Sequence, residues 1–380
     1  MTSTRAREHA HKHSGPGIWL AWMALLCMLH GGVHVRGCSF LVTTKQDVPL
    51  PEHTAAFGDE ASWNFLMKLR GPDLTNSVRL NGMHFVHNLL HMTGEVTPQP
   101  FYDNVGNVVA IFNGEIYNYK AFGDYASDGQ AIIAAYHKFG ERFTNKFRGE
   151  FAIVLCDFTK GIVVISTDVF AIKPVYVAVQ GGQLAIASYE SALLRLGFDT
   201  PLEQAPNMVV VRSLDPAQDF AVLRRYSVFD FDLRQHKRTL DDWNKAWQLS
   251  MERRTEGALH GMFVGMSSGD DSGAIACKMH EMNLSHHLYS IKGHEQMSIV
   301  NARFNFAKST AVEHRLQIKW HTYNNVSAWN KKHVEPYSYW WEPCYWKLRW
   351  HGVDNGPSFI LPSTGPGLPP LNTFDPDVQV

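Results

Sequence analysis

The chain has 380 residues, of which 45% are hydrophobic and 19% are charged, and its formal net charge at pH 7 is −1. This composition is that of a globular protein, and the length predicts two domains. No basic block follows the first few residues, which excludes a nucleic-acid surface built on positive charge. The 5 Cys residues are irregularly spaced, which excludes a disulfide framework and a cysteine zinc site.

The start of the chain predicts a signal-like leader over residues 1–37. A polar, basic stretch comes first, and residues 18–29 then form an apolar run. That run is too short to cross a bilayer comfortably, but it has the length of a signal-peptide core. Small residues before Cys38 predict cleavage at that point, which would make Cys38 the new N-terminus. The alternative is that the leader stays and Cys38 lies within a strand.

An apolar run at residues 108–111 predicts a strand that continues into Asn113 and Gly114. An Asn side-chain amide beside a Gly backbone N–H is a suitable pair of donors for an oxyanion. Asn-Gly after a strand is also a common turn. The pair alone therefore leaves both interpretations open.

The longer stretch from Phe112 to Tyr119, with Ser127-Asp128-Gly129-Gln130 after it, resembles the glutaminase signature of glutamine-hydrolysing asparagine synthetases. These enzymes are class II glutamine amidotransferases. Further family-like segments lie before and after it, in the family's order: Arg70–Asp73, Gln99–Phe101, Phe147–Ala152, Thr167–Tyr176 and Ala187–Glu190. The resemblance implies an N-terminal-nucleophile αββα sandwich, of mixed α/β and α+β class, over residues 38–212.

The resemblance also implies the roles of the site residues. Cys38 would be the catalytic nucleophile, and its own free α-amine would take the thiol proton. Asn113 and Gly114 would hold the oxyanion. Together with Glu115 and Asp128 they would bind glutamine, whose α-ammonium would meet Asp128.

In the glutaminase half, one position departs from the family pattern. The family places an Arg on the strand before the signature, where its planar fork holds the α-carboxylate of glutamine. Leu89 stands at the matching position of this chain. An apolar side chain cannot pair with a carboxylate, so Arg70 and Arg79 are the candidate replacements.

The second half begins with residues 240–256, whose apolar spacing predicts an amphipathic helix. Residues 261–266 then read as a strand, followed by the small-residue loop Ser267–Gly273. Such a loop lets backbone N–H groups surround a phosphate. It resembles the pyrophosphate loop of ATP-using synthetases, which implies a partial, doubly wound parallel sheet (PP-loop) domain over residues 235–380.

The resemblance implies ATP and Mg²⁺ as cofactors. The predicted ATP-binding residues are Met266, Ser267, Ser268, Gly269, Asp271, Ser272, Ile291, Ser363 and Thr364. Asp271 is also the predicted magnesium ligand. Residues 288–291 and 318–320 read as strands, and residues 307–313 as a helix. The family has a further loop near the end of this domain, whose acidic residues serve magnesium. Gly367 and Leu368 stand where two of its carboxylates are expected.

The sequence therefore predicts an asparagine synthetase-like protein with glutamine, aspartate and ATP as partners and no nucleic acid. Two alternatives stay open: an impaired relative that acts as a binding or regulatory module, and a glutaminase without synthetase output. The sequence leaves the oligomeric state open, with a homodimer as one option. Membrane association is expected only if the leader is retained. If the leader is cleaved, the protein is expected in the secretory pathway; if it is retained, the protein is expected in the cytoplasm.

Overall fold

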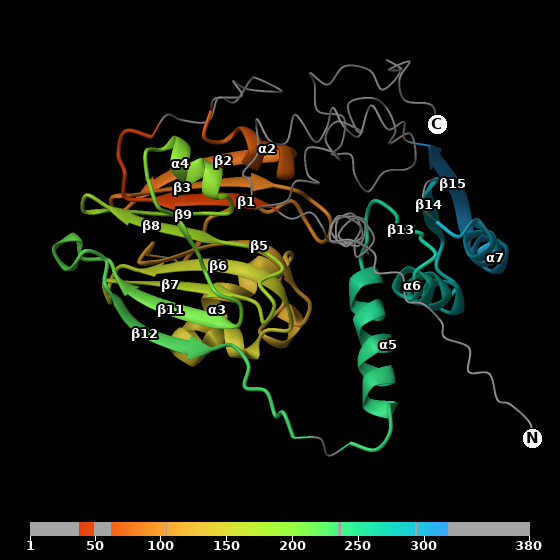
Figure 1. Cartoon of the computed structure of the whole chain (residues 1–380). Coiled ribbons are helices and arrows are strands. Elements are labelled where there is room, and N and C mark those ends of the chain that lie inside the picture. The colour runs from red at the N-terminus through yellow and green to blue at the C-terminus, as the bar shows by residue number, and fades with distance from the viewer. Residues whose placement is uncertain (1–37, 49–61, 104, 235–236, 293–294, 318–380) are drawn as a thin grey trace, which may run out of the picture.

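The computed structural model describes residues 38–48, 62–103, 105–234, 237–292 and 295–317 (Figure 1). The predicted leader and the predicted loop at 363–368, with Ser363 and Thr364, lie outside these residues. Figure 1 shows a β-sandwich, a smaller α/β unit, and helix α5 standing between them. No helix in the described ranges combines the length and the apolar character that crossing a bilayer requires.

The first sheet of the sandwich has six antiparallel strands in the order β10-β8-β9-β1-β3-β2. Its strands are β1 (Ser39–Thr43), β2 (Leu74–Leu80), β3 (Met83–Leu89), β8 (Tyr176–Gln180), β9 (Gln183–Ala187) and β10 (Leu202–Glu203). Strand β1 is central, with Ser39 opposite Asn88 of β3 and Leu41 opposite Ala187 of β9. The residue before β1, Cys38, therefore lies at one end of the sheet.

The second sheet also has six antiparallel strands, in the order β12-β11-β7-β6-β5-β4. They are β4 (Phe101–Tyr102), β5 (Val108–Ile116), β6 (Gly149–Asp157), β7 (Ile162–Thr167), β11 (Met208–Ser213) and β12 (Val222–Ser227). The predicted strand of Asn113 and Gly114 is the end of β5. Both residues stay in the ladder, opposite Ala152 and Phe151 of β6, so they do not form a turn.

The sandwich has three apolar layers, because β-strands alternate their side chains between two faces. Between the sheets, Phe40 and Phe85 pack against Ile111 and Val154. Helices α2 (Phe65–Arg70) and α4 (Glu190–Arg195) cover the outer face of the first sheet. Helix α3 (Ala131–Phe139) covers the outer face of the second. The predicted αββα sandwich is confirmed.

The smaller unit is a three-stranded parallel sheet in the order β13-β14-β15. Its elements are α5 (Asp241–Thr255), β13 (Phe263–Gly265), α6 (Asp270–Glu281), β14 (His286–Lys292), α7 (Met297–Ala307) and β15 (Ala311–Gln317). The helix predicted at 240–256 and the strands predicted at 261–266 and 288–291 agree with α5, β13 and β14. The strand predicted at 318–320 lies outside the described residues.

The helix predicted at residues 307–313 is wrong. Helix α7 ends at Ala307, and residues 311–317 form strand β15. The helix lies earlier because Val300, Phe304 and Ala307, at helical spacing, bury one face in the core of this unit. Val312 is β-branched and suits the strand that follows.

Candidate active site

Three side chains project into the space between the two sheets at the same end of the sandwich. Cys38 is in phase with Phe40, and Asn113 is in phase with Ile111; both of these partners belong to the inter-sheet core. The same alternation turns Leu89 of β3 inward, one register step from the Ser39–Asn88 pair. The fold thus brings together a thiol, an amide and an apolar side chain from three strands.

The Cys38 thiol is buried against the backbone of Leu90. Its Sγ accepts a hydrogen bond from the Leu90 N–H at 3.4 Å and donates to the Leu90 carbonyl at 3.9 Å. Burial raises the pKa of the thiol to about 12, and the charges of Glu115 and Asp128 add to this effect. A neutral thiol is a weak nucleophile, so Cys38 needs a base at neutral pH.

The Asn113 side chain is fully buried, yet neither its Oδ1 nor its Nδ2 has a hydrogen-bond partner among the described residues. Leaving a buried amide unsatisfied costs about 1–3 kcal/mol. Most buried polar groups are paired, so an exception calls for an explanation. A ligand oxygen bound at Nδ2 would supply one, which fits the predicted oxyanion donor.

Gly114 follows Asn113 in a conformation that favours glycine, with φ at 148°. A Cβ built at this position would lie 2.0 Å from the carbonyl oxygen of Glu150. The close approach of β6 therefore requires a residue without a side chain. This keeps the backbone of Gly114 beside the Asn113 amide, as the predicted pair requires.

The Asp128 carboxylate is held by backbone donors. Its Oδ2 accepts from the Ile116 N–H at 2.7 Å, and its Oδ1 accepts from the Gly129 N–H at 2.8 Å. These bonds fix the carboxylate beside the end of β5. Burial nevertheless raises the pKa of Asp128 to about 6.

Glu115 lies close to two other carboxyl groups, those of Asp128 and Glu150. Its Oε2 accepts from the Thr93 hydroxyl at 3.2 Å. Burial raises the pKa of Glu115 to about 8, the charge of Asp128 adds to the rise, and the charge of Lys173 opposes it. The charge of Glu150 raises this pKa further. Glu115 therefore holds a proton through much of the neutral range.

Two buried members of this cluster were not predicted as site residues. Glu150 is 4% exposed and Lys173 is 1% exposed. Burial lowers the pKa of Lys173, while the charge of Glu150 opposes that shift. Their proximity depends on strand register, because Glu150 is the direct partner of Glu115 across β5 and β6. The only sequence signal was their position in the family-like segments 147–152 and 167–176.

The structure separates the two candidate replacements for the missing arginine. Arg79 is opposite His84, at the end of the sheet far from Cys38, and its guanidinium bonds to the Val48 carbonyl at 3.3 Å. It is wrong as a carboxylate ligand at this site. Arg70 is buried, and its charge acts on the pKa of Lys173, so it lies near the cluster.

In the smaller unit, the loop from Ser267 to Gly269 closes on itself before α6. The Ser267 N–H donates to the Ser272 hydroxyl at 3.1 Å, and the Gly269 N–H donates to the Ser267 Oγ at 3.1 Å. The Ser268 N–H and hydroxyl both donate to Oε2 of Glu295 at 2.5 Å. The loop thus presents donors that suit an anion, and in this structure a carboxylate of the chain receives them.

Three further residues predicted to bind ATP fall within the described ranges. Met266 is buried in the core, Asp271 is exposed in the first turn of α6, and Ile291 is in strand β14. Over the described ranges, no three His, Cys, Asp or Glu side chains gather closely enough to hold a metal ion. ATP and Mg²⁺ stay predictions.

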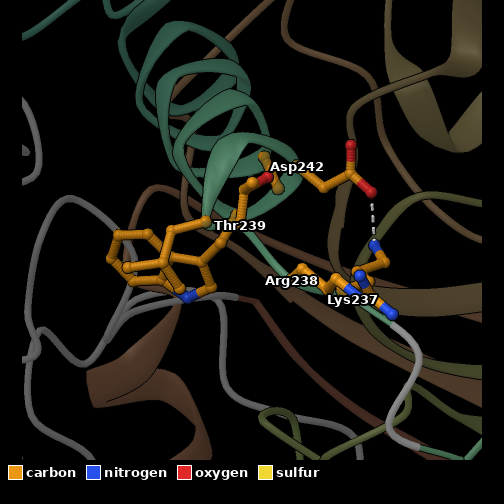
Figure 2. Close-up of a pocket in the computed structure, with 7 residues that line it drawn as sticks. Lys237, Arg238, Thr239 and Asp242 are labelled. Atoms are coloured by element: carbon orange, nitrogen blue, oxygen red, sulfur yellow. Dashed lines mark ion pairs between the residues drawn. The ribbon is translucent and has the colours of Figure 1, made fainter.

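A pocket at the start of α5 lies apart from these residues (Figure 2). Lys237 and Asp242 form an ion pair there at 2.5 Å, beside Trp243. Figure 2 shows the ion pair as a dashed line at one side of the pocket. None of the predicted site residues lines this pocket.

Comparison with known proteins agrees with this geometry. Residues 60–225 match the family model described as a glutamine amidotransferase domain. A Mycobacterium bovis protein assigned as a glutamine-hydrolysing asparagine synthetase is 33% identical over 178 residues, which are 40% of this chain and 27% of that protein. Asparagine synthetase B of Escherichia coli K12 is 33% identical over 140 residues, which are 34% of this chain and 25% of that protein. The similarity predicted from the motifs is confirmed.

The Penicillium rubens protein named amidase chyE is 32% identical over 108 residues, which are 26% of this chain and 16% of that protein. The chain thus spans about a quarter or less of the length of these relatives. A glutamine phosphoribosylpyrophosphate amidotransferase structure from B. subtilis matches with a TM-score of 0.34 at 11% identity, over 80% of this chain and 64% of that one. A likeness of this size adds nothing to the fold described above.

Proposed function

We propose that this chain, whose residues 60–225 match a glutamine amidotransferase domain, hydrolyses the side-chain amide of glutamine with Cys38 as its nucleophile. The observation that carries the proposal is the unsatisfied Asn113 amide, buried in the same inter-sheet space as the Cys38 thiol. Most buried polar groups are paired, whereas an oxyanion site needs a buried donor that is not.

The reaction requires that Cys38 be the first residue of the mature protein. Its α-amine, with an ordinary pKa of about 8, takes the thiol proton as Sγ attacks the amide carbon. The Asn113 Nδ2 and the Gly114 N–H stabilise the oxyanion of the tetrahedral intermediate. The protonated amine then returns the proton to the leaving nitrogen, and ammonia departs. Water hydrolyses the remaining thioester to glutamate and restores Cys38.

Ionisable side chains would orient both α-groups of the substrate. Asp128, fixed by two backbone N–H groups, faces the α-ammonium of glutamine, and Glu115 adds to this attraction once it is ionised. We assign the α-carboxylate to Arg70, a buried arginine near the cluster, because Leu89 is apolar and Arg79 lies at the far end of the sheet. Arg70→Ala should raise KM for glutamine more than it lowers kcat.

The finer proposal is that ammonia passes to aspartate activated by ATP, as expected of an asparagine synthetase-like protein. When bound, ATP would supply the leaving group that activates the acceptor carboxylate. The support is the donor loop at Ser267–Gly269, which precedes α6 as phosphate-binding loops precede a helix. ATP-dependent use of aspartate, measured as pyrophosphate release, tests this step.

A second candidate is glutamine hydrolysis without the ATP step. It is favoured by Glu295, whose carboxylate already takes both donors of Ser268. A phosphate at this place would have to displace it. The binding or regulatory module gains no such specific support from the site.

The experiment measures ammonia release from glutamine by protein that begins at Cys38, with Cys38→Ala as its control. The proposal predicts release by the first protein and none above background by the second. Equal release by both would overturn the nucleophile assignment. Pyrophosphate release that depends on aspartate would separate the synthetase proposal from the glutaminase one.

A further inference from the structure

We propose that the end of α5 and the turn after it, residues 254–260, hold the two loops that border the amide-hydrolysing site, with Tyr117 as a positioning residue between Arg254 and Glu150. This inference rests on the proposed glutaminase function and extends it. The two loops are residues 90–94, after β3, and residues 117–120, after β5.

The first loop is held by direct bonds to the turn after α5. The His260 Nε2 lies 3.0 Å from the His91 carbonyl oxygen, and the Leu259 N–H donates to the Met92 carbonyl at 3.4 Å. The rings of His91 and His260 meet edge to face, with their centroids 6.1 Å apart. These contacts join the loop after β3 to a segment more than 160 residues later in the chain.

The second loop is held from the last turn of α5. The guanidinium carbon of Arg254 lies 5.2 Å from the centre of the Tyr117 ring, which is a cation–π contact. Lys120 and Glu256 form an exposed ion pair at 3.3 Å. Exposed pairs contribute little to stability. Arg254 is therefore the stronger of the two links.

Both loops carry groups that position the site. In the first, the Leu90 N–H donates to Cys38 Sγ and the Thr93 hydroxyl donates to Glu115. In the second, the Tyr117 hydroxyl donates to Glu150 at 3.2 Å. A displacement of residues 254–260 would therefore shift the two loops, and with them the groups that contact Cys38, Glu115 and Glu150.

The hydrogen bond from Tyr117 to Glu150 affects how readily Glu115 ionises. Glu115 is faced by Asp128 from η2 (Asp128–Gln130), by Lys173 before β8, by the Thr93 hydroxyl and by Glu150 on β6. The hydroxyl of Tyr117 stabilises the negative charge of Glu150, and Arg254 above the ring strengthens that donor. Loss of either leaves the Glu150 charge less compensated, so that Glu115 is harder to ionise.

The test compares Tyr117→Phe and Arg254→Met with Arg253→Met, a matched change on the neighbouring residue, all in protein that begins at Cys38. Ionised Glu115 binds the substrate ammonium, so KM for glutamine should fall as pH rises through about 8. Tyr117→Phe and Arg254→Met should move the midpoint of this fall upward by about half a pH unit or more, with a smaller change in kcat. Arg253→Met should leave it in place. Equal midpoints in all proteins would overturn the proposal.

A second measurement does not depend on catalysis. Amide hydrogen exchange at residues 90–94 and 117–120 should rise about tenfold in an Arg254→Met, His260→Ala double variant, but not in Arg253→Met. Unchanged exchange in the double variant would overturn the positioning role, whether or not the wild-type protein releases ammonia. Absence of ammonia release by the wild-type protein, with increased exchange in the double variant, would count against the proposed function alone.

Discussion

Glu115 of β5 and Glu150 of β6 are direct partners across two antiparallel strands, with their Cα atoms paired in the ladder. Like charges placed opposite each other destabilise a sheet. Here both side chains turn into the inter-sheet space beside Asp128. The site therefore carries an electrostatic cost that a structural role alone would not require, as expected where binding groups are gathered.

The first prediction concerns Glu115→Gln. The pKa of Glu115 is about 8 in the folded protein and about 4.5 in the unfolded chain, so between these values the folded state holds the extra proton. The contribution of Glu115 to the free energy of unfolding is therefore present at low pH and is lost as pH rises from about 4.5 to 8. Glu115→Gln should raise the free energy of unfolding by on the order of 1–3 kcal/mol at pH 8 and by little near pH 4. Urea unfolding at both pH values checks this; a gain that is equal at both would contradict it.

The second prediction separates function from stability at Asn113. Asn113→Leu removes an unsatisfied buried amide, so the free energy of unfolding should rise by about 1 kcal/mol. The same change should lower kcat for ammonia release by roughly 100- to 1,000-fold, because one oxyanion donor is lost. Thermal unfolding and steady-state kinetics on one preparation measure both effects.

A matched control for this prediction is Asn118→Leu. The Asn118 side chain is satisfied: its Nδ2 donates to the Lys146 carbonyl at 2.9 Å, and its Oδ1 accepts from the Arg148 N–H at 2.7 Å. This variant should lose about 1–2 kcal/mol of stability. A loss of the same size in Asn113→Leu would show that the Asn113 amide has a structural partner after all.

The third prediction concerns Gly114. Gly114→Ala would place a Cβ 2.0 Å from the Glu150 carbonyl, so β5 and β6 must separate at the site. We expect a loss of about 2–4 kcal/mol in stability and of most of the ammonia release. The control is Gly82→Ala, whose φ is 77° but whose Cβ would meet no atom within 4 Å. It should cost only about 1 kcal/mol, and equal losses in calorimetry would contradict the close approach.

The fourth prediction concerns acid stability. Burial lowers the pKa of His87 to about 3 from an ordinary 6.5. Between these values the unfolded chain binds the extra proton, so this histidine's contribution is lost as pH falls from 6.5. His87→Leu should reduce the acid dependence of the free energy of unfolding by about 1.4 kcal/mol per pH unit in this range. Parallel stability curves for the two proteins would contradict it.

Much of this arrangement could be predicted from sequence, because the family-like segments carry the strand order and the residues at the end of β5. The predicted sandwich is confirmed. The position of Asn113 also followed from its apolar strand. The sequence left open whether Asn113 and Gly114 form a turn after the strand or remain paired within the sheet. The pairing of β5 with β6 settled it, since Asn113 and Gly114 both have partners there.

The rest could not be predicted, because it depends on register and long-range contact. The pairing of Glu115 with Glu150 requires the alignment of two strands, and a slip of one residue would turn either side chain to the other face. The contact between Arg254 and Tyr117 joins separate units. Helix α7 was predicted too late in the chain because its buried residues Val300, Phe304 and Ala307 are separated in the sequence by polar ones such as Asn301 and Arg303.

The most direct measurement compares ammonia release from glutamine by two proteins that differ only at the start: one begins at Cys38, and one keeps Gly37 before it. Our account predicts release by the first and a loss of at least 100-fold in the second, because the α-amine that must take the proton is then part of a peptide bond. Equal rates in the two proteins would contradict the account, since the thiol would then be activated by another base.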